Sequence, residues 1–239
     1  MVEYNKLLDS AEVISPNVWD NNAEMLTQPG GDPRQTVLRN FLKQNTNLFG
    51  VSDGQIDALA TAADYTNPDG NLSFVHLEQK INGVPVFAGE VKAGFDSKGR
   101  IIRVINELAP GLDHERVAKD FGDPANAVRT AGQYIDHDLA DANLILNSKQ
   151  STDLKAVFGR GDWATTAEKM YFPIEPGLAV PAWRVLIWEP VNAYYVIVDA
   201  ESGTMLGVRI LPRTNRRRPR STCIETLTRI STSPTVRLH

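Results

Sequence analysis

The sequence lacks the residue patterns that several large classes of enzyme require. It contains one cysteine, Cys223, so an internal disulfide and a multi-cysteine metal site are excluded. Its four histidines never stand in the His-Glu-x-x-His spacing that holds the metal and the general base on one helix of a zinc peptidase. A Gly-x-Ser-x-Gly elbow and a phosphate-binding glycine loop are also missing. We therefore expect no catalytic residues, no metal site and no cofactor.

Long apolar runs are absent too. No stretch of about 18 consecutive apolar residues occurs, so the sequence predicts no membrane insertion. The chain as written starts without the basic and then apolar pattern of an export signal. On this pattern alone the expected location is the cytoplasm.

The net charge of −4 hides a strong asymmetry along the chain. Residues 209–239 hold eight arginines and one acid, whereas residues 1–208 hold 17 basic and 28 acidic side chains. An acidic body of this kind repels phosphate groups, so nucleic acid is not expected as a partner. The Arg-rich segment over 209–239 has no sustained apolar period and predicts an irregular, disordered basic tail.

The first half of the chain predicts a linker followed by a helix and a sheet. Residues 1–33 show scattered apolar positions and a Gly-Gly pair, which is typical of an arm or linker. Apolar side chains then recur at helical spacing and predict a helix over about 33–46. Alternating runs between Leu72 and Leu108 predict a meander of three antiparallel strands. We expect this helix and sheet to form one subdomain over 34–112.

The second half repeats that plan over 113–208. Asp123 is suited to cap a helix and Pro124 to occupy its first position. Four extended segments follow the helix, at 154–158, 168–174, 182–189 and 193–199. The sequence therefore predicts the α+β class, with two helix-plus-antiparallel-sheet subdomains in tandem.

Two features are candidates for binding a partner. Asn82 and Gly83 are typical of a tight hairpin turn whose central residues have positive φ, and the tip of such a turn is free to touch a partner. Trp183 and Trp188 lie on opposite faces of one strand if the strand alternates regularly. At most one of them then belongs to the core, and the other is a candidate anchor at an interface.

Several motifs resemble a known family. The segments Leu77–Glu90, Gly99–Val104 and Leu108–Gly111 resemble the fungalysin/thermolysin propeptide (FTP) motif, and Phe41–Gly50 is similar to its helix. The segments 180–190 and 194–206 resemble the PepSY-type second half of such propeptides, most like those of bacterial fungalysin relatives.

The resemblance implies two cystatin-like subdomains that act on a zinc metallopeptidase without being catalytic. In relatives the partner is the metallopeptidase catalytic domain of the same chain, and here that domain could also be met in trans. The propeptide inhibits the peptidase and assists its folding as an intramolecular chaperone. The family resemblance also implies a secreted protein, in the extracellular space or the cell envelope. The alternative is a stand-alone cystatin-like protein that binds a non-protease partner.

Overall fold

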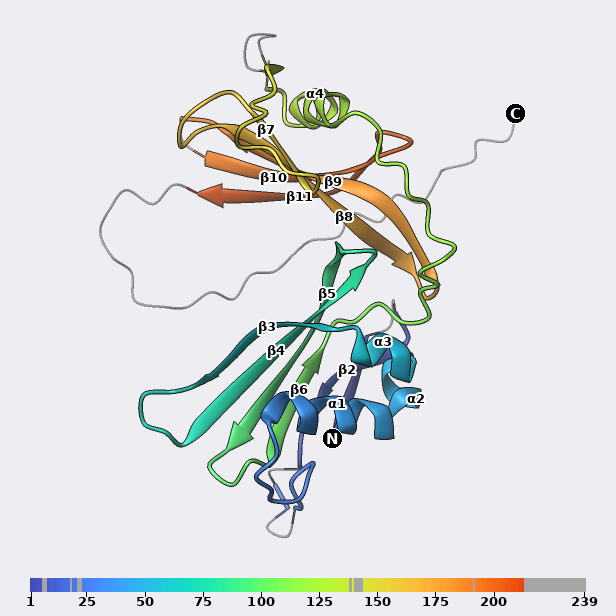
Figure 1. The fold of residues 1–239 in the computed structure, drawn as a ribbon, viewed down its shortest axis with the longest axis vertical. Helices are drawn as coiled ribbons and strands as arrows, with labels where there is room; N and C mark the ends of the chain where they lie inside the picture. Colours follow the sequence, from blue (N-terminus) through green and yellow to red (C-terminus); the bar gives the residue numbers. More distant parts are fainter. Residues whose placement is uncertain are drawn as a thin grey trace. The chain divides into compact units, whose positions relative to one another are not determined.

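The computed structural model describes residues 1–5, 8–17, 19–20, 23–137, 139, 144–190 and 192–212. The chain divides into two compact units (Figure 1). The first contains residues 1–117 and 171–180, and the second contains residues 118–170 and the chain from 181 onward. Residues 171–180, which the sequence had suggested for the second half, therefore belong to the first unit. Both units combine helix with antiparallel strands, which confirms the predicted α+β class.

Three helices precede the meander in the first unit. Apolar spacing places Leu38, Phe41 and Leu42 on the buried side of the first helix. The third helix begins with a capping box, in which the Ser52 hydroxyl accepts from the Gln55 N–H while the Gln55 side chain accepts from the Ser52 N–H. These helices are α1 (Arg34–Gln44), α2 (Thr46–Phe49) and α3 (Asp53–Asp57).

The strands of the first unit pair in the order β1-β2-β6-β5-β4-β3, with every neighbouring pair antiparallel. Side chains in β4 alternate between buried and half-buried positions along its whole length, so one face of the sheet packs on the helices and the other stays open. The strands are β1 (Val2–Asn5), β2 (Ser10–Ile14), β3 (Ala60–Thr66), β4 (Leu72–Ile81), β5 (Val84–Asp96) and β6 (Ile101–Asn106).

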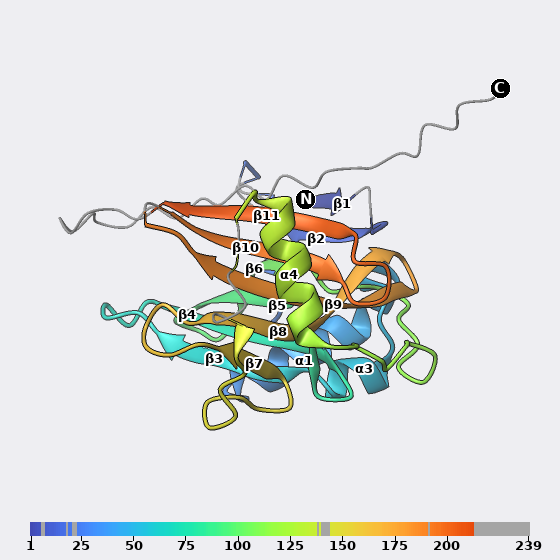
Figure 2. The same cartoon turned by 90° about the horizontal axis from the view of Figure 1, so that it is seen from above.

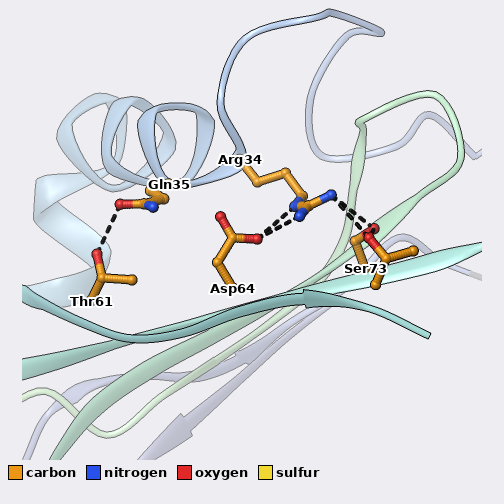
Figure 3. Close-up of polar contacts among 6 residues, drawn as sticks. Arg34, Gln35, Thr61, Asp64 and Ser73 are labelled. Atoms are coloured by element: carbon orange, nitrogen blue, oxygen red, sulfur yellow. Dashed lines mark hydrogen bonds and ion pairs between the residues drawn. The ribbon is translucent and has the colours of Figure 1, made fainter. Parts of the chain in front are cut away.

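Polar contacts join α1 to strand β3 (Figure 3). The Arg34 guanidinium donates from Nε and Nη2 to Asp64 Oδ1 at 2.9 and 2.6 Å, and from Nη1 to Ser73 Oγ at 3.2 Å. Thr61 Oγ1 donates to Gln35 Oε1 at 2.8 Å. The forked guanidinium therefore holds β3 against the helix and against β4.

The linker expected over 1–33 requires a correction. Residues 2–5 and 10–14 are strands, and β2 pairs with β6 through Val13 opposite Ile105. The buried Asn106 amide donates to Ala11 O at 2.8 Å and fixes this pairing. Strand β2 is held by a residue 95 positions further along the chain. A short strand of this kind need not show the alternation of apolar and polar residues in its own sequence. The edge strand β3 was not predicted either, because most of its side chains are exposed.

The second unit packs one helix, α4 (Pro124–Tyr134), across its strands and against β10 (Figure 2). The Asp123 carboxylate caps α4 by accepting from the Ala125 N–H at 2.9 Å, and Pro124 opens the helix as predicted. Its strands are β7 (Lys155–Phe158), β10 (Asn192–Asp199) and β11 (Met205–Pro212). It also holds residues 165–170 of β8 (Thr165–Glu175) and residues 181–188 of β9 (Leu178–Trp188).

Strand β11 also corrects the predicted irregular tail. Its residues 209–212 continue the pairing with β10, in which Arg209 lies opposite Tyr195. The tail prediction for residues 213–239 lies outside the described residues. Within the part of the chain that is described, no helix has the length and apolar character to cross a membrane.

Candidate partner-binding surfaces

The hairpin between β4 and β5 has the tight turn that the sequence predicts. Asn82 and Gly83 both have positive φ, at 52° and 82°, and Ile81 pairs with Val84 across the turn. Both turn residues are exposed, and the Asn82 amide donates to His114 O at 3.4 Å. A Cβ on Gly83 would meet nothing within 4 Å. The tip is therefore open to a partner, and its role in binding stays a prediction.

A wide bulge follows this turn in β5. Glu78 pairs with Glu90 and Lys80 with Pro85, so the single residue Gln79 faces the four residues 86–89. Ala88 adopts a φ of 51° inside the bulge. A Cβ on Gly89 would lie 2.8 Å from Val86 Cβ and 3.1 Å from Gln79 Cβ, so only glycine fits there without a shift.

The bulge brings two residues of β5 into contact with residues 171 and 172. Val86 pairs in parallel with Tyr171, and the Phe87 ring stacks on Phe172 with centroids 5.0 Å apart and an interplanar angle of 22°. All four residues belong to the first unit. The bulge thereby joins residues 171–172 to a sheet built from the first half of the chain.

The open face of the first sheet holds a charged cluster that sequence reasoning missed. His76 Nε2 lies 2.7 Å from Glu90 Oε2, and Lys92 contacts the other carboxylate oxygen of Glu90. The Glu107 N–H donates to Glu90 O at 2.8 Å. Desolvation of the Glu107 carboxyl group, together with the negative charge of Glu90, raises the pKa of Glu107. Strand alternation was the signal that could have placed His76, Glu90 and Lys92 on one face.

Trp183 belongs to the core of the second unit. Its side chain is 3% exposed, and Nε1 donates to Phe121 O at 2.6 Å. The Phe121 ring meets it edge-on at 6.0 Å, and Lys169 Nζ lies 5.8 Å from its ring centroid. Trp183 is thus buried on the α4 side of the sheet, where it has no surface to offer a partner.

Trp188 lies on the opposite face of the same strand. Opposite Trp188 on β10 is Ala193, whereas Trp183 stands opposite Val198, and the two positions differ in parity along β9. Trp188 is half-buried and meets the 57%-exposed Trp163 edge-on at 5.1 Å. Trp163 could not be assigned to this face from the sequence, because it lies in the connection between β7 and β8.

The described part of the chain contains no group of three or more His, Cys, Asp and Glu side chains that could hold a metal ion. His137 Nδ1 is instead 3.1 Å from Glu189 Oε1.

Comparison with known proteins gives one family match. No curated protein matches the chain. Among solved structures, the Bacillus megaterium YpeB C-terminal domain aligns with a TM-score of 0.29 and 13% identity, over 80% of this chain and 70% of that one. A TM-score of this size does not establish a shared fold. The family model of the Fungalysin/Thermolysin Propeptide Motif matches residues 57–108, which run from the end of α3 to just beyond β6. Residues 57–108 therefore carry a fungalysin/thermolysin propeptide motif.

Proposed function

We propose that this chain is a propeptide-type module that inhibits a zinc metallopeptidase of the fungalysin/thermolysin type and assists its folding. The observation that carries the proposal is the propeptide motif at residues 57–108. This motif belongs to propeptides and not to catalytic domains. The absence of a His-Glu-x-x-His segment from the 239 residues agrees with a non-catalytic role.

The matched segment supplies surfaces suited to docking. It contains the exposed turn at Asn82 and Gly83, and the charged open face around Glu90. Inhibition would follow if these surfaces covered the active-site cleft of the peptidase. Assistance in folding would follow by mass action, because a ligand that binds only the native peptidase stabilises it against unfolding.

The test uses the whole chain and the purified catalytic domain of a fungalysin-type peptidase. Peptide hydrolysis is measured against increasing chain concentration, and the yield of active peptidase is measured after dilution from denaturant with and without the chain. We expect slower hydrolysis and a higher yield. An unchanged rate and an unchanged yield at micromolar chain would contradict the proposal.

A variant pair tests which surface is involved. Asn82→Asp adds a charge to the exposed tip and keeps a residue type that tolerates positive φ, whereas Gln28→Ala changes an exposed residue of the same unit outside the motif. We expect inhibition to weaken with the tip variant and to stay unchanged with Gln28→Ala. Equal inhibition by both would remove the hairpin tip from the proposed interface.

The expected location follows from the same proposal. An inhibitor of a secreted peptidase acts in the extracellular space or the cell envelope. Fractionation of the source organism with an antibody against the chain tests this. Recovery in the cytoplasm alone would contradict it.

A further inference from the structure

Strand β3 forms one edge of the sheet in the first unit (Figure 1). It pairs with β4 alone among the described strands, so the backbone groups along its other side, its outer edge, have no neighbouring strand. Thr61 and Tyr65, which lie on opposite faces of the sheet, are both exposed. A strand edge that is open in this way is a template for a further strand.

The turn after β3 shows which backbone groups point outward. The Asn67 N–H donates to Leu72 O at 2.9 Å, and opposite positions in an antiparallel pair alternate between bonded and non-bonded. Tyr65 therefore bonds to β4, whereas Asp64 and Thr66 direct their N–H and C=O groups away from it. These outward groups have no hydrogen-bond partner among the described residues. Asp64 is an exposed residue although its side chain is 23% exposed, which agrees with an open main chain.

The strand lacks most of the features that keep edge strands from pairing. Protected edges are commonly very short or carry lysine or proline. Strand β3 has seven residues, Ala-Thr-Ala-Ala-Asp-Tyr-Thr, and neither residue type occurs in it. Its one charged side chain, Asp64, accepts from Arg34 at 2.6 Å and is thereby neutralised. A bulge between Thr61 and Ala63 lies near the start of the strand and leaves residues 63–66 regular.

The two faces of β3 differ in polarity. The face toward α1 is polar, because the side chains of Asp64 and Thr66 both accept from Arg34 (Figure 3). On the other face, the Tyr65 ring stacks on Phe74 with centroids 5.3 Å apart and stays 56% exposed. Side chains of neighbouring strands interact across each face, and aromatic residues pair well with β-branched ones. A segment with alternating apolar and polar residues therefore fits this edge.

A second copy of β3 fits the edge poorly. Bonded pairing centred on Asp64 would place the two aspartates directly opposite each other, where like charges are destabilising. Pairing centred on Tyr65 would bring in Pro68, which has no N–H to donate. We propose that the outer edge of β3 binds an extended segment of a partner protein as an added strand, with apolar side chains beside Tyr65 and polar ones beside Arg34. In this mode main-chain hydrogen bonds supply affinity and alternate side chains supply specificity.

The test uses the full chain and the blocked peptide acetyl-Lys-Val-Thr-Val-Thr-Val-Lys-amide, which matches β3 in length and alternates in polarity. Exchange of each backbone N–H with water is followed by NMR. At a peptide concentration ten times the dissociation constant, exchange at Asp64 and Thr66 should slow about tenfold, because only the free chain exchanges there. Exchange at Tyr65, whose N–H already bonds to β4, should stay unchanged.

Modified peptides test the main-chain contact and the alternation. One peptide carries N-methyl groups on both threonines, and another carries them on the two valines that precede these threonines. Successive N–H groups of an extended segment point to opposite sides, so one of the two should fail to bind and the other should bind like the parent. The peptide acetyl-Lys-Val-Val-Thr-Thr-Val-Lys-amide has the same composition without the alternation, and it should bind about fivefold more weakly.

A pair of protein variants tests the apolar face. Tyr65→Thr keeps a residue suited to strands and removes the aromatic surface, so binding should weaken about two- to fivefold. Tyr4→Thr is the matched control, because Tyr4 is 54% exposed and lies on β1 at the opposite edge of the same sheet. That change should leave binding as it is. Slow exchange along β4 reports that each variant is folded.

Three results would overturn the inference. The first is unchanged exchange at Asp64 and Thr66 in millimolar peptide. The second is equal binding of the two methylated peptides, which would exclude main-chain pairing. The third is slower exchange as the concentration of the chain rises without peptide, which would assign the edge to a second copy. Because no peptidase is present, each of these failures leaves the proposed propeptide role untouched.

Discussion

The side-chain amide of Gln79 forms two hydrogen bonds with the backbone of Ala109. Gln79 Nε2 donates to Ala109 O at 3.1 Å, and Gln79 Oε1 accepts from the Ala109 N–H at 2.9 Å. Gln79 is 3% exposed and Ala109 is 1% exposed. The amide thus takes the place of a neighbouring strand in bonding the segment after β6. Gln79 is also the residue of β4 that lies opposite the bulge in β5.

Replacing Gln79 by leucine should lower the free energy of unfolding of the first unit by about 2–3 kcal/mol, because it leaves a buried N–H and a buried C=O of Ala109 unpaired. Urea unfolding followed by circular dichroism measures the change. Gln28→Leu, at an exposed position of the same unit, should change the stability by less than about 0.5 kcal/mol. Equal effects of the two variants would show that the Gln79 amide contributes no net stability.

Gly89→Ala should destabilise the first unit by about 1–3 kcal/mol, the usual cost of overpacking. The new methyl group would lie 2.8 Å from Val86 Cβ, and the bulge would have to open. Gly54→Ala provides the matched control, because a Cβ there meets nothing within 4 Å and the residue lies in α3. That change should stabilise the unit by up to about 1 kcal/mol. A neutral Gly89→Ala would show that the bulge is not tightly packed.

The hairpin between β4 and β5 shows which features can be predicted from the sequence and which cannot. Asn82 and Gly83 specify a two-residue turn with positive φ, and the structure has that turn between the expected strands. The bulge that starts three residues after Gly83 could not be predicted, because Val86 and Phe87 have the pattern of a continuous strand while their partners, Tyr171 and Phe172, lie 85 residues further along. Local patterns specify turns and alternation, and distant pairing decides where a strand leaves its neighbour.

The two tryptophans of β9 should respond differently to truncation. Trp183→Ala removes a core side chain and leaves Phe121 O without its donor, so we expect a loss of about 3–5 kcal/mol in the second unit. Trp188→Ala removes a half-buried side chain on the open face and should cost less than about 2 kcal/mol. Urea unfolding of both variants measures the difference. Equal losses would contradict the assignment of only one tryptophan to the core.

Alternation predicts that Trp183 and Trp188 face opposite ways, but it does not tell which one is buried. The choice depends on where α4 and Phe121 pack, and these residues are about 60 positions earlier in the chain. The charged residues on the face of the second unit's sheet opposite α4 could be assigned to that face only once the buried tryptophan was known. The sequence could therefore predict that the two tryptophans lie on opposite faces of β9, but not which face of the sheet is exposed.

Glu168→Gln should reduce stability at neutral pH and lose its effect in acid. The pKa of Glu168 is lowered in the folded state, because hydrogen bonds from Arg184 and Lys155 outweigh the effect of burial. A lowered pKa contributes stability that is present above the unfolded value of about 4.3 and is lost as the pH falls through the folded value. We expect a difference of about 1 kcal/mol at pH 7, given that both cations are partly exposed. Urea unfolding midpoints at several pH values test this, and a difference that persisted in acid would contradict it.

Glu107→Gln should show the opposite trend. Desolvation and the charge of Glu90 raise the pKa of Glu107, so the folded state holds the proton more tightly than the unfolded chain and is destabilised as the pH rises between the two values. The variant should match the parent below about pH 4, near the unfolded pKa, and should be the more stable protein at pH 7. In a Glu90→Gln background this gain should shrink, because one of the two causes has been removed. Urea midpoints at about pH 4, 5.5 and 7 measure the trend, and a parallel shift at all three would show that Glu107 is solvated like an ordinary surface carboxylate.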